Sequence, residues 1–360
     1  MSESKFIPYV GLDFILKRST TPILLEVNDH PVGLFSEESD LESLKHSTDQ
    51  ILNVVKRNIS KGIVCFLLPD FFEINRDGHV TRQLLFPPNI DNTLLATAKE
   101  FQLVCDSLNN MGIQSLISDV NGIKTIGTAC YCQDKKIDVL VRRSNHFPKK
   151  ELSVFSINDI RSRSVCVDKK RLKDVLTDKF SKSIFPSQFS NNASYLIKKP
   201  RFGMASKGIE RKAFSDAVEC GWNNIGEKWI VEEWIEPSFH ELNGWQYYFD
   251  LRVYVLNGKV ESVVTRSSAF PLNAQKSFDL DWLTTTGSSA IIYNSHSGFK
   301  TDQYDKNLFD GIQKTIDLSE RIVAYLDGYI GKLNTSDEFS KIPSLNELWG
   351  INGKVRTIQL

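Results

Sequence analysis

The stretch "GLDFILKRSTTPILLEVNDHP", residues 11–31, decides how the rest of the chain is interpreted. Apolar residues dominate both halves and the polar turn "KRSTT" separates them, which predicts two antiparallel strands. Asp13 lies on the first strand, and Glu26 and Asn28 share one face of the second, because side chains alternate along a strand. Two carboxylates and an amide oxygen suit Mg²⁺. As an isolated motif a charged hairpin at a sheet edge is the simpler interpretation, so the metal site depends on the other motifs.

The composition bounds the size of the protein and its class of partner. With 360 residues, the chain should form two or three packed units. Apolar residues make up 41% and aromatic residues 11%, which is enough to fill their cores. Lys and Arg together number 44, as do Asp and Glu, so no overall charge attracts nucleic acid or an anionic membrane. We expect neither partner.

The six cysteines are scattered through apolar segments, with no CxxC pair and no Cys/His cluster at zinc spacing. This pattern is typical of buried, reduced thiols. No signal-peptide pattern opens the sequence, and no apolar run approaches the ~18–20 residues that a membrane span needs. We therefore expect a cytoplasmic protein, which could form a homodimer.

The first part of the chain alternates between strand and helix patterns. Apolar residues recur at helical spacing over 36–59 and 91–112, and short β-branched runs follow at 62–70, 113–118 and 137–144. This rhythm predicts an open α/β domain.

The second part has a different character. Residues 163–180 are typical of a short strand that leads into a helix, and 308–328 predict a long amphipathic helix. Residues 250–268 alternate on both sides of Asn257-Gly258, a dipeptide that favours a type I′ hairpin turn. The mixture predicts an α+β domain.

A glycine-rich loop follows a strand in "YLIKKPRFGMASKGI", residues 195–209. The strand ends in Lys199, and Gly203, Ser206 and Gly208 lie in the loop. Backbone N–H groups of such a loop can cradle phosphate oxygens, whose charge a neighbouring lysine neutralises. A surface hairpin with solvated lysines would have the same pattern.

The strand "KWIVEEWIEP", residues 228–237, offers a second candidate binding element. Its backbone could contact the edge of an adenine between apolar side chains, at the four residues Glu232, Glu233, Trp234 and Ile235. Alone the motif is weak, because charged aromatic strands are common.

Charged residues also gather on the hairpin at 250–268. Asp250 and Arg252 lie two residues apart and therefore share a face, and Arg266 lies at the far end of the partner strand. An ordinary salt bridge on a sheet surface would look the same.

In combination, these ordered motifs resemble the ATP-grasp superfamily. The resemblance implies that Lys169, in "VDKKRL", is the first nucleotide-binding lysine, and that Lys199 is the second, before the glycine-rich loop. It implies that residues 232–235 are the adenine hinge and that Asp250 contributes to the nucleotide site. Asp13, Glu26 and Asn28 resemble the metal ligands of D-alanine–D-alanine ligase.

The order of the motifs resembles that of a circularly permuted member. A helix like the one at 308–328 normally precedes the metal-binding hairpin, which here comes first, as in eukaryotic glutathione synthetase and glutathionylspermidine synthetase. The implied parts are metal-binding strands (1–35), a Rossmann-like substrate domain (36–155), a lid (156–225), a C-terminal lobe (226–335) and a tail (336–360). We therefore expect residues 9–35 to join the sheet formed by 229–268, away from residues 40–60.

The resemblance implies an ATP-dependent carboxylate–amine ligase. Its cofactors would be ATP and Mg²⁺, two ions for which Mn²⁺ can substitute, and its partners a small carboxylate and an amine. Some relatives carry an arginine where this chain has Gly11, so Arg252 or Arg266 would stabilise the reaction intermediate. Arg142 and Arg143 would bind substrate. Two alternatives stay open: a kinase of the same fold that phosphorylates a hydroxyl, and a non-catalytic nucleotide-binding protein.

Overall fold

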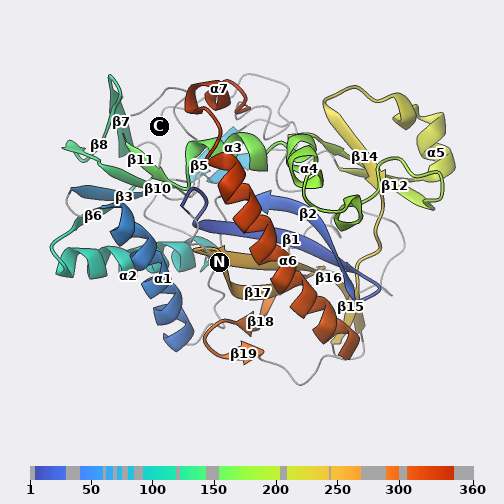
Figure 1. Ribbon diagram of the computed structural model, residues 1–360, viewed down its shortest axis with the longest axis horizontal. Coiled ribbons are helices and arrows are strands. Elements are labelled where there is room, and N and C mark those ends of the chain that lie inside the picture. The colour runs from blue at the N-terminus through green and yellow to red at the C-terminus, as the bar shows by residue number, and fades with distance from the viewer. Residues whose placement is uncertain are drawn as a thin grey trace.

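A computed structural model of the chain describes residues 5–29, 41–59, 62–67, 71–74, 80–84, 92–118, 122–142, 154–202, 209–242, 245–268, 289–299 and 306–343. Its fold is mixed α/β, with one end built on a parallel sheet and the other on a larger antiparallel sheet (Figure 1). None of the described helices has the length and apolar character that crossing a membrane requires.

The parallel sheet has the strand order β11-β10-β3-β6. Its strands are β3 (Ile63–Leu67), β6 (Gln114–Ser118), β10 (Val139–Arg142) and β11 (Phe155–Ile157), and every neighbouring pair is parallel. Helices α1 (Leu41–Asn58) and α2 (Asn92–Asn110) supply its apolar cover on one side, where Val55 and Phe101 join Phe66 in a shared core. The predicted open α/β arrangement is confirmed for these elements.

Smaller strands accompany this sheet. β7 (Ile123–Ile126), β8 (Ala129–Cys132) and β9 (Lys135–Lys136) form an antiparallel sheet, and Cys130 and Cys132 pack against Cys65 and Leu140 of the parallel sheet. β4 (Phe71–Ile74) and β5 (Val80–Leu84) form a separate hairpin.

The larger sheet has the order β19-β18-β17-β16-β1-β2, with β15 added beside β16. Its strands are β1 (Tyr9–Lys17), β2 (Thr21–Asn28), β15 (Phe239–Leu242), β16 (Trp245–Leu256), β17 (Lys259–Ser267), β18 (Ser289–Asn294) and β19 (Gly298–Phe299). The N-terminal hairpin therefore pairs with β16, more than 200 residues later in the chain. Asn257 (φ 54°) and Gly258 (φ 80°) make the predicted left-handed turn between β16 and β17.

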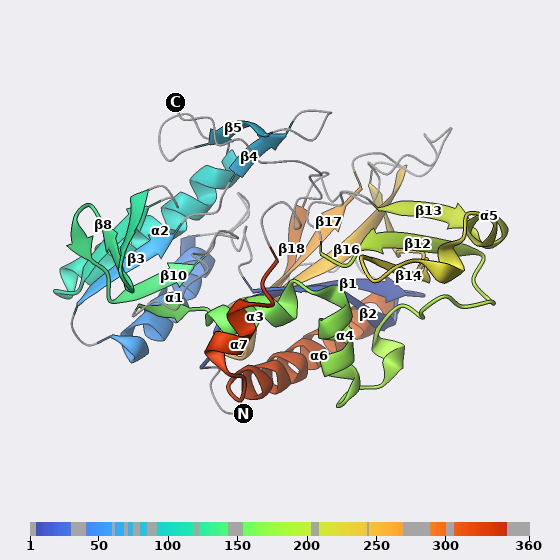
Figure 2. The same cartoon turned by 90° about the horizontal axis from the view of Figure 1, so that it is seen from above.

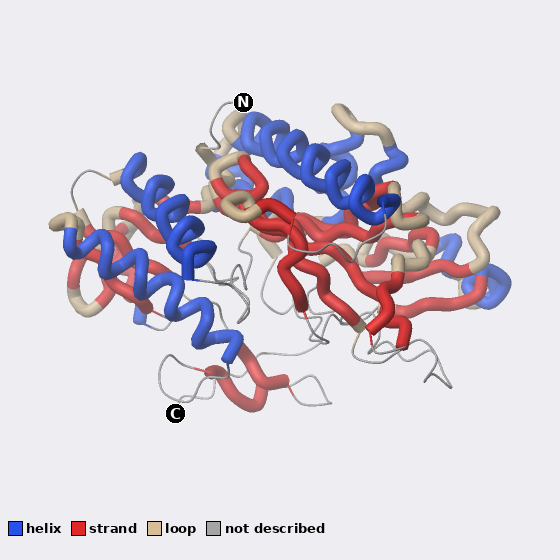
Figure 3. Tube along the Cα trace, turned by 90° about the horizontal axis from the view of Figure 1, so that it is seen from below, coloured by secondary structure: helices blue, strands red, loops and turns tan. Residues whose placement is uncertain are grey.

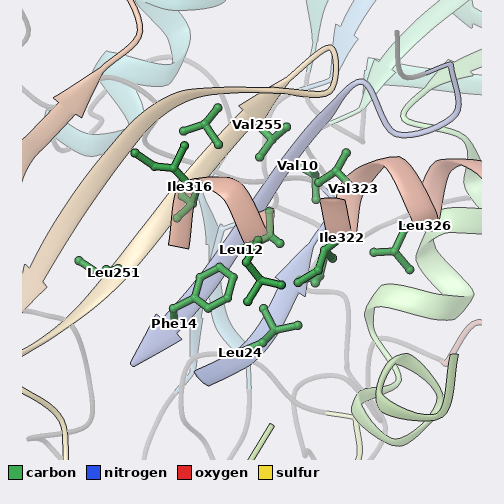
Figure 4. Close-up of a cluster of buried hydrophobic side chains, with 14 of the residues drawn as sticks. Val10, Leu12, Phe14, Leu24, Leu251, Val255, Ile316, Ile322, Val323 and Leu326 are labelled. Carbon is green, nitrogen blue, oxygen red and sulfur yellow. The ribbon is translucent and has the colours of Figure 1, made fainter. Parts of the chain in front are cut away.

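Helix α6 (Lys306–Ile330) packs across β2, β1, β16 and β17 and covers one face of this sheet (Figure 2). Its apolar side chains interdigitate with those of the strands in a core that includes Val10, Leu12, Phe14, Leu24, Leu251, Val255, Ile316, Ile322, Val323 and Leu326 (Figure 4). At the start of the sheet, the Asp327 carboxylate of α6 accepts backbone hydrogen bonds from Phe6 (2.6 Å) and Ile7 (3.0 Å).

The opposite face of the larger sheet contacts the parallel-sheet end of the molecule. Tyr9, Tyr254 and Leu256 belong to the same apolar core as Val55 and Phe101 of α1 and α2. Figure 3 shows these two helices at one end and the long α6 across the other.

A third sheet is antiparallel and has the order β13-β12-β14. It consists of β12 (Tyr195–Pro200), β13 (Glu210–Ala213) and β14 (Trp229–Glu233), with α5 (Phe214–Glu219) and the 3₁₀ turns η2 (Lys182–Ile184) and η3 (Trp222–Asn224) nearby in sequence. For the described part of residues 9–35, the expectation of a sheet shared with 229–268 thus holds for β16 and β17. It is wrong for β14, because the backbone of β14 pairs with β12. The expected separation from residues 40–60 is wrong at Tyr9, which packs in one apolar core with Val55 of α1.

Short helices connect these sheets. The strand predicted at the start of 163–180 is wrong, because two helices occupy this region: α3 (Ile160–Cys166) and α4 (Lys169–Thr177). Asp159 caps the first by accepting a hydrogen bond from the backbone N–H of Arg161, and Asp168 caps the second by accepting from those of Lys170 and Arg171. A last helix, α7 (Thr335–Phe339), packs against α3.

Candidate functional site

The candidate site starts from a row of charged side chains across the larger sheet. Asp13 on β1 lies directly opposite Glu26 on β2 and opposite Arg252 on β16. Leu12 and Phe14 belong to the core under α6, so Asp13 between them points to the other face of the sheet. Strand alternation therefore places the charged row on the face away from α6.

Asp13 is buried, with 3% of its surface exposed, and two arginines hold it. Arg252 donates from Nε and Nη2 to the two carboxylate oxygens, at 2.7 Å each. Arg266 contacts both carboxylates. Its Nη2 lies 3.0 Å from Oδ2 of Asp13. Its Nε donates to Oδ1 of Asp250 at 2.8 Å, and its Nη2 donates to Oδ2 of Asp250 at 2.7 Å. The four side chains form one chain of ion pairs.

These contacts set the protonation of both carboxyl groups. Burial on its own would raise the pKa of Asp13, but the guanidinium groups of Arg252 and Arg266 hold it well below its usual range. Burial raises the pKa of Asp250, and Arg266 offsets this only in part. Asp13 is therefore the firmly ionised member of the pair.

Glu26 and Asn28 extend the row on β2. The Asn28 amide donates to Oε1 of Glu26 at 3.2 Å, and both side chains are half-buried. Glu26 is the cross-strand neighbour of Asp13. Within the described ranges no group of three or more His, Cys, Asp and Glu side chains could hold a metal, so the candidate set is two carboxylates and one amide. These hard oxygen donors on adjacent strands fit a cation such as Mg²⁺.

Lysines lie beside this row and on the third sheet. Lys199 Nζ is 2.6 Å from Glu232 on the neighbouring strand, and Lys173 Nζ on α4 is 3.3 Å from the same carboxylate. Burial would raise the pKa of Glu232, yet the two ammonium groups lower it. This carboxylate stays ionised between two lysines.

Lys169, the first residue of α4, interacts electrostatically with both clusters. Burial lowers the pKa of Lys169, the negative charge of Glu26 raises it, and the ammonium of Lys199 lowers it further. Both neighbours therefore lie within electrostatic range of Lys169. The charge of the predicted first lysine thus interacts with the predicted second lysine and with one predicted metal carboxylate.

Neighbouring lysines lie apart from this cluster. Lys198 points away from Lys199, pairs with Glu210 at 2.5 Å and lies over the ring of Trp229 at 4.9 Å. Lys170 Nζ lies 3.4 Å from the exposed Glu227. Lys173 was not predicted, although its spacing of four residues from Lys169 on one helix face could have indicated it.

The predicted adenine hinge, residues 232–235, spans the end of β14. The backbone N–H of Glu233 donates to Ser187 O at 2.7 Å and that of Trp234 to Tyr195 O at 3.0 Å. Ile235 is buried in a small apolar cluster with Ile15 and Ile23. These two N–H groups are thus engaged within the fold, so an adenine would have to use other backbone groups.

Arg142 lies at the end of β10 with a fully buried side chain, and its Nη2 donates to Asp29 Oδ2 at 2.8 Å. Its predicted substrate contact would require it to exchange this partner. The other predicted residues Arg143, Gly203, Ser206 and Gly208 lie outside the described residues.

Comparison with known proteins adds a structural likeness. No protein-family model matches the chain, and no curated protein matches its sequence. Its structure is similar to that of a protein from Methylobacillus flagellatus KT that is provisionally named gamma-glutamylcysteine synthetase. The two chains share a fold. The TM-score is 0.52 at 9% sequence identity, and the match covers 92% of this chain and 91% of that one.

Proposed function

We propose that this protein is an ATP-dependent carboxylate–amine ligase with a circularly permuted ATP-grasp fold. The observation that carries the proposal is that five elements, α4, β12, β2, β1 and β16, supply one charged region. Asp13 lies between Glu26 and Arg252 on adjacent strands, and Lys169 interacts electrostatically with Glu26 and Lys199. The proposal gains support from the fold shared with a protein named as a synthetase.

The permutation is supported by the neighbours of the N-terminal hairpin. β1 lies between β2 and β16, and the backbone just before β1 is bound by Asp327 of α6. In a chain of the ordinary order, α6 would lead directly into β1.

Nucleotide phosphates would be bound by Lys169 and Lys199. Glu232 would be the counter-ion of Lys199, because a buried, charged lysine needs one. Lys173 keeps that carboxylate ionised from the opposite side. An arriving phosphate would compete with Glu232 for the Lys199 ammonium.

Asp13, Glu26 and Asn28 would hold the divalent ion. When bound, the ion would neutralise charge on the nucleotide phosphates. Arg252 and Arg266 keep Asp13 deprotonated and so available as a ligand.

The reaction would proceed in two balanced steps. An oxygen of the substrate carboxylate attacks the γ-phosphorus of ATP, the bond to the β-phosphate oxygen breaks, and ADP leaves. The amine then attacks the carbonyl carbon of the acyl phosphate and the bond from that carbon to the bridging oxygen breaks. Phosphate departs with the former carboxylate oxygen and takes up the proton that the amine loses. Arg252 and Arg266 would stabilise the negative charge that develops on the carbonyl oxygen.

A hydroxylamine assay tests the ligase. Amino acids would be screened singly with ATP, Mg²⁺ and hydroxylamine, beginning with glutamate because of the neighbour's name. We expect ADP and a hydroxamate, both abolished by Glu26→Gln while binding of a fluorescent ATP analogue persists. A stable phosphorylated alcohol without hydroxamate would identify a kinase, and no ADP with any substrate would favour a non-catalytic protein.

A further inference from the structure

A buried charge cluster lies immediately after the proposed metal strand. Asp29 follows Asn28, is completely buried, and accepts three side-chain hydrogen bonds. Arg142 Nη2 lies 2.8 Å from Oδ2, Ser162 Oγ 2.8 Å from the same oxygen, and Arg163 Nη1 3.0 Å from Oδ1. Donors from both β10 and α3 therefore fix this one carboxylate.

The backbone around Asp29 is fixed as well. The Asn158 side chain donates to the carbonyl oxygens of Tyr9 and Asp29, and accepts from the backbone N–H of Tyr9 at 3.0 Å. The end of β2 and the beginning of β1 are thus bound to the segment after β11. These contacts hold the ends of both strands in place, and they thereby constrain the direction in which Asn28 and Glu26 project.

Arg142 connects this cluster to the parallel sheet. It is the last residue of β10 and lies opposite Leu67, the last residue of β3. Its side chain has no exposed surface, so a substrate could reach it only if neighbouring groups moved. This burial favours a structural connection over a direct ligand contact.

We propose that Arg142 is a positioning residue, which acts through Asp29 to orient Asn28 and Glu26 as cation ligands. This rests on the proposed function, because the cation site belongs to it. Residues that hold metal ligands in place commonly change metal affinity by 10–100-fold when altered. The parallel-sheet part of the chain would therefore set the affinity of the cation site without contacting the ion.

The test measures Mn²⁺ binding to the full chain by electron paramagnetic resonance, without substrates. We expect Arg142→Gln to weaken Mn²⁺ binding by about 10–100-fold, and Arg142→Lys, which keeps one donor and the charge, to weaken it less. Arg161→Gln is the control. Arg161 lies on α3 and forms an ion pair of 2.8 Å with Asp159, the residue that caps this helix, and this ion pair does not include Asp29. This substitution should leave Mn²⁺ affinity within about twofold of wild type.

Binding of a fluorescent ATP analogue in EDTA supplies the second readout, and we expect it to be unchanged in Arg142→Gln. Wild-type Mn²⁺ affinity in Arg142→Gln would overturn the positioning role and leave the ligase proposal intact. Equal loss of nucleotide and Mn²⁺ binding would also overturn it, because Arg142 would then support the whole fold. If Arg142→Gln does not fold, wild-type Mn²⁺ affinity in Arg142→Lys overturns it. A wild-type chain that binds neither probe would overturn the proposed function itself.

Discussion

Arg252 and Asp13 are joined by two hydrogen bonds of 2.7 Å, which run in parallel from one planar guanidinium to both oxygens of one carboxylate. They are direct cross-strand neighbours on β16 and β1, although 239 residues separate them. This geometry leaves the third nitrogen of the guanidinium, Nη1, for another acceptor, and the Arg252 side chain is 18% exposed. The residue can therefore hold a proposed metal ligand and face a substrate at once.

Arg252→Lys should separate charge from geometry. Lysine keeps the positive charge but cannot reproduce the planar fork. We expect kcat for ADP formation to fall by about 10²–10³-fold, the usual effect of removing one donor to a developing oxyanion. Affinity for the fluorescent ATP analogue should not change, and a variant with full kcat would remove Arg252 from the reaction.

The adjacent lysines of β12 provide a matched pair for nucleotide binding. Lys199→Ala should weaken ATP binding by roughly 1.5–3 kcal/mol, the usual contribution of a hydrogen bond to a charged group. Lys198→Ala should have little effect, since Lys198 pairs with Glu210 on the other side of the strand. Isothermal titration calorimetry would measure both. Equal losses would argue against the assignment of Lys199.

Two glycines of α6 provide a matched pair for stability. A Cβ at Gly311 would lie 2.3 Å from the carbonyl oxygen of Ser19, in the β1–β2 turn, whereas a Cβ at Gly328 meets no atom within 4 Å. Gly311→Ala should lower the free energy of unfolding by about 1–3 kcal/mol because of this overlap. Gly328→Ala should raise it by about 0.5–1 kcal/mol because alanine favours the helix. Urea denaturation would measure both, and stabilisation by Gly311→Ala would show that α6 does not pack closely on the hairpin.

The contribution of Glu338, on α7, to the stability of the fold should depend on pH, because its carboxylate pairs with Arg171 on α4. Burial would raise the pKa of Glu338, but hydrogen bonds from Arg171, Lys341 and Ser164 hold it at about 2. Because this lies below the unfolded value of about 4.3, the carboxylate stabilises the fold above that pH, and the effect is lost as the pH falls toward about 2.

Glu338→Gln should therefore cost roughly 1.5–3 kcal/mol at pH 7. The difference from wild type should shrink steadily between about pH 4.3 and pH 2. Urea denaturation across this range checks it, with Glu227→Gln as the control because the Glu227 side chain is 80% exposed. If the difference in unfolding free energy between variant and wild type is the same at every pH, the charge of Glu338 does not contribute to stability.

Local patterns in the sequence were sufficient for much of the sheet structure. Alternation predicted the hairpin of β1 and β2, and Asn257-Gly258 predicted the turn between β16 and β17 because few residues adopt positive φ easily. The charged row could be predicted for the same reason, because Asp13, Glu26 and Arg252 lie on strands and alternation shows which face each side chain occupies.

Other features could not be predicted from local sequence patterns. Helix α3 has only seven residues, and nearly all are buried, so it lacks the amphipathic pattern that marks a longer helix. The Asp29 cluster joins residues separated by 113 and 134 positions, which no local periodicity reveals. Arg142 was predicted from a resemblance as a substrate ligand, and only its burial against Asp29 suggested the positioning role.

The most direct test of the ligase proposal follows one oxygen atom. The protein would be incubated with ATP, Mg²⁺, an amine, and a carboxylate substrate from the hydroxamate screen labelled with ¹⁸O in its carboxyl group. Attack of that carboxylate on the γ-phosphorus transfers one labelled oxygen to the released phosphate, which mass spectrometry detects. We predict one ¹⁸O atom in each phosphate formed together with amide product. Unlabelled phosphate, or label retained entirely in the organic product, would contradict an acyl-phosphate ligase.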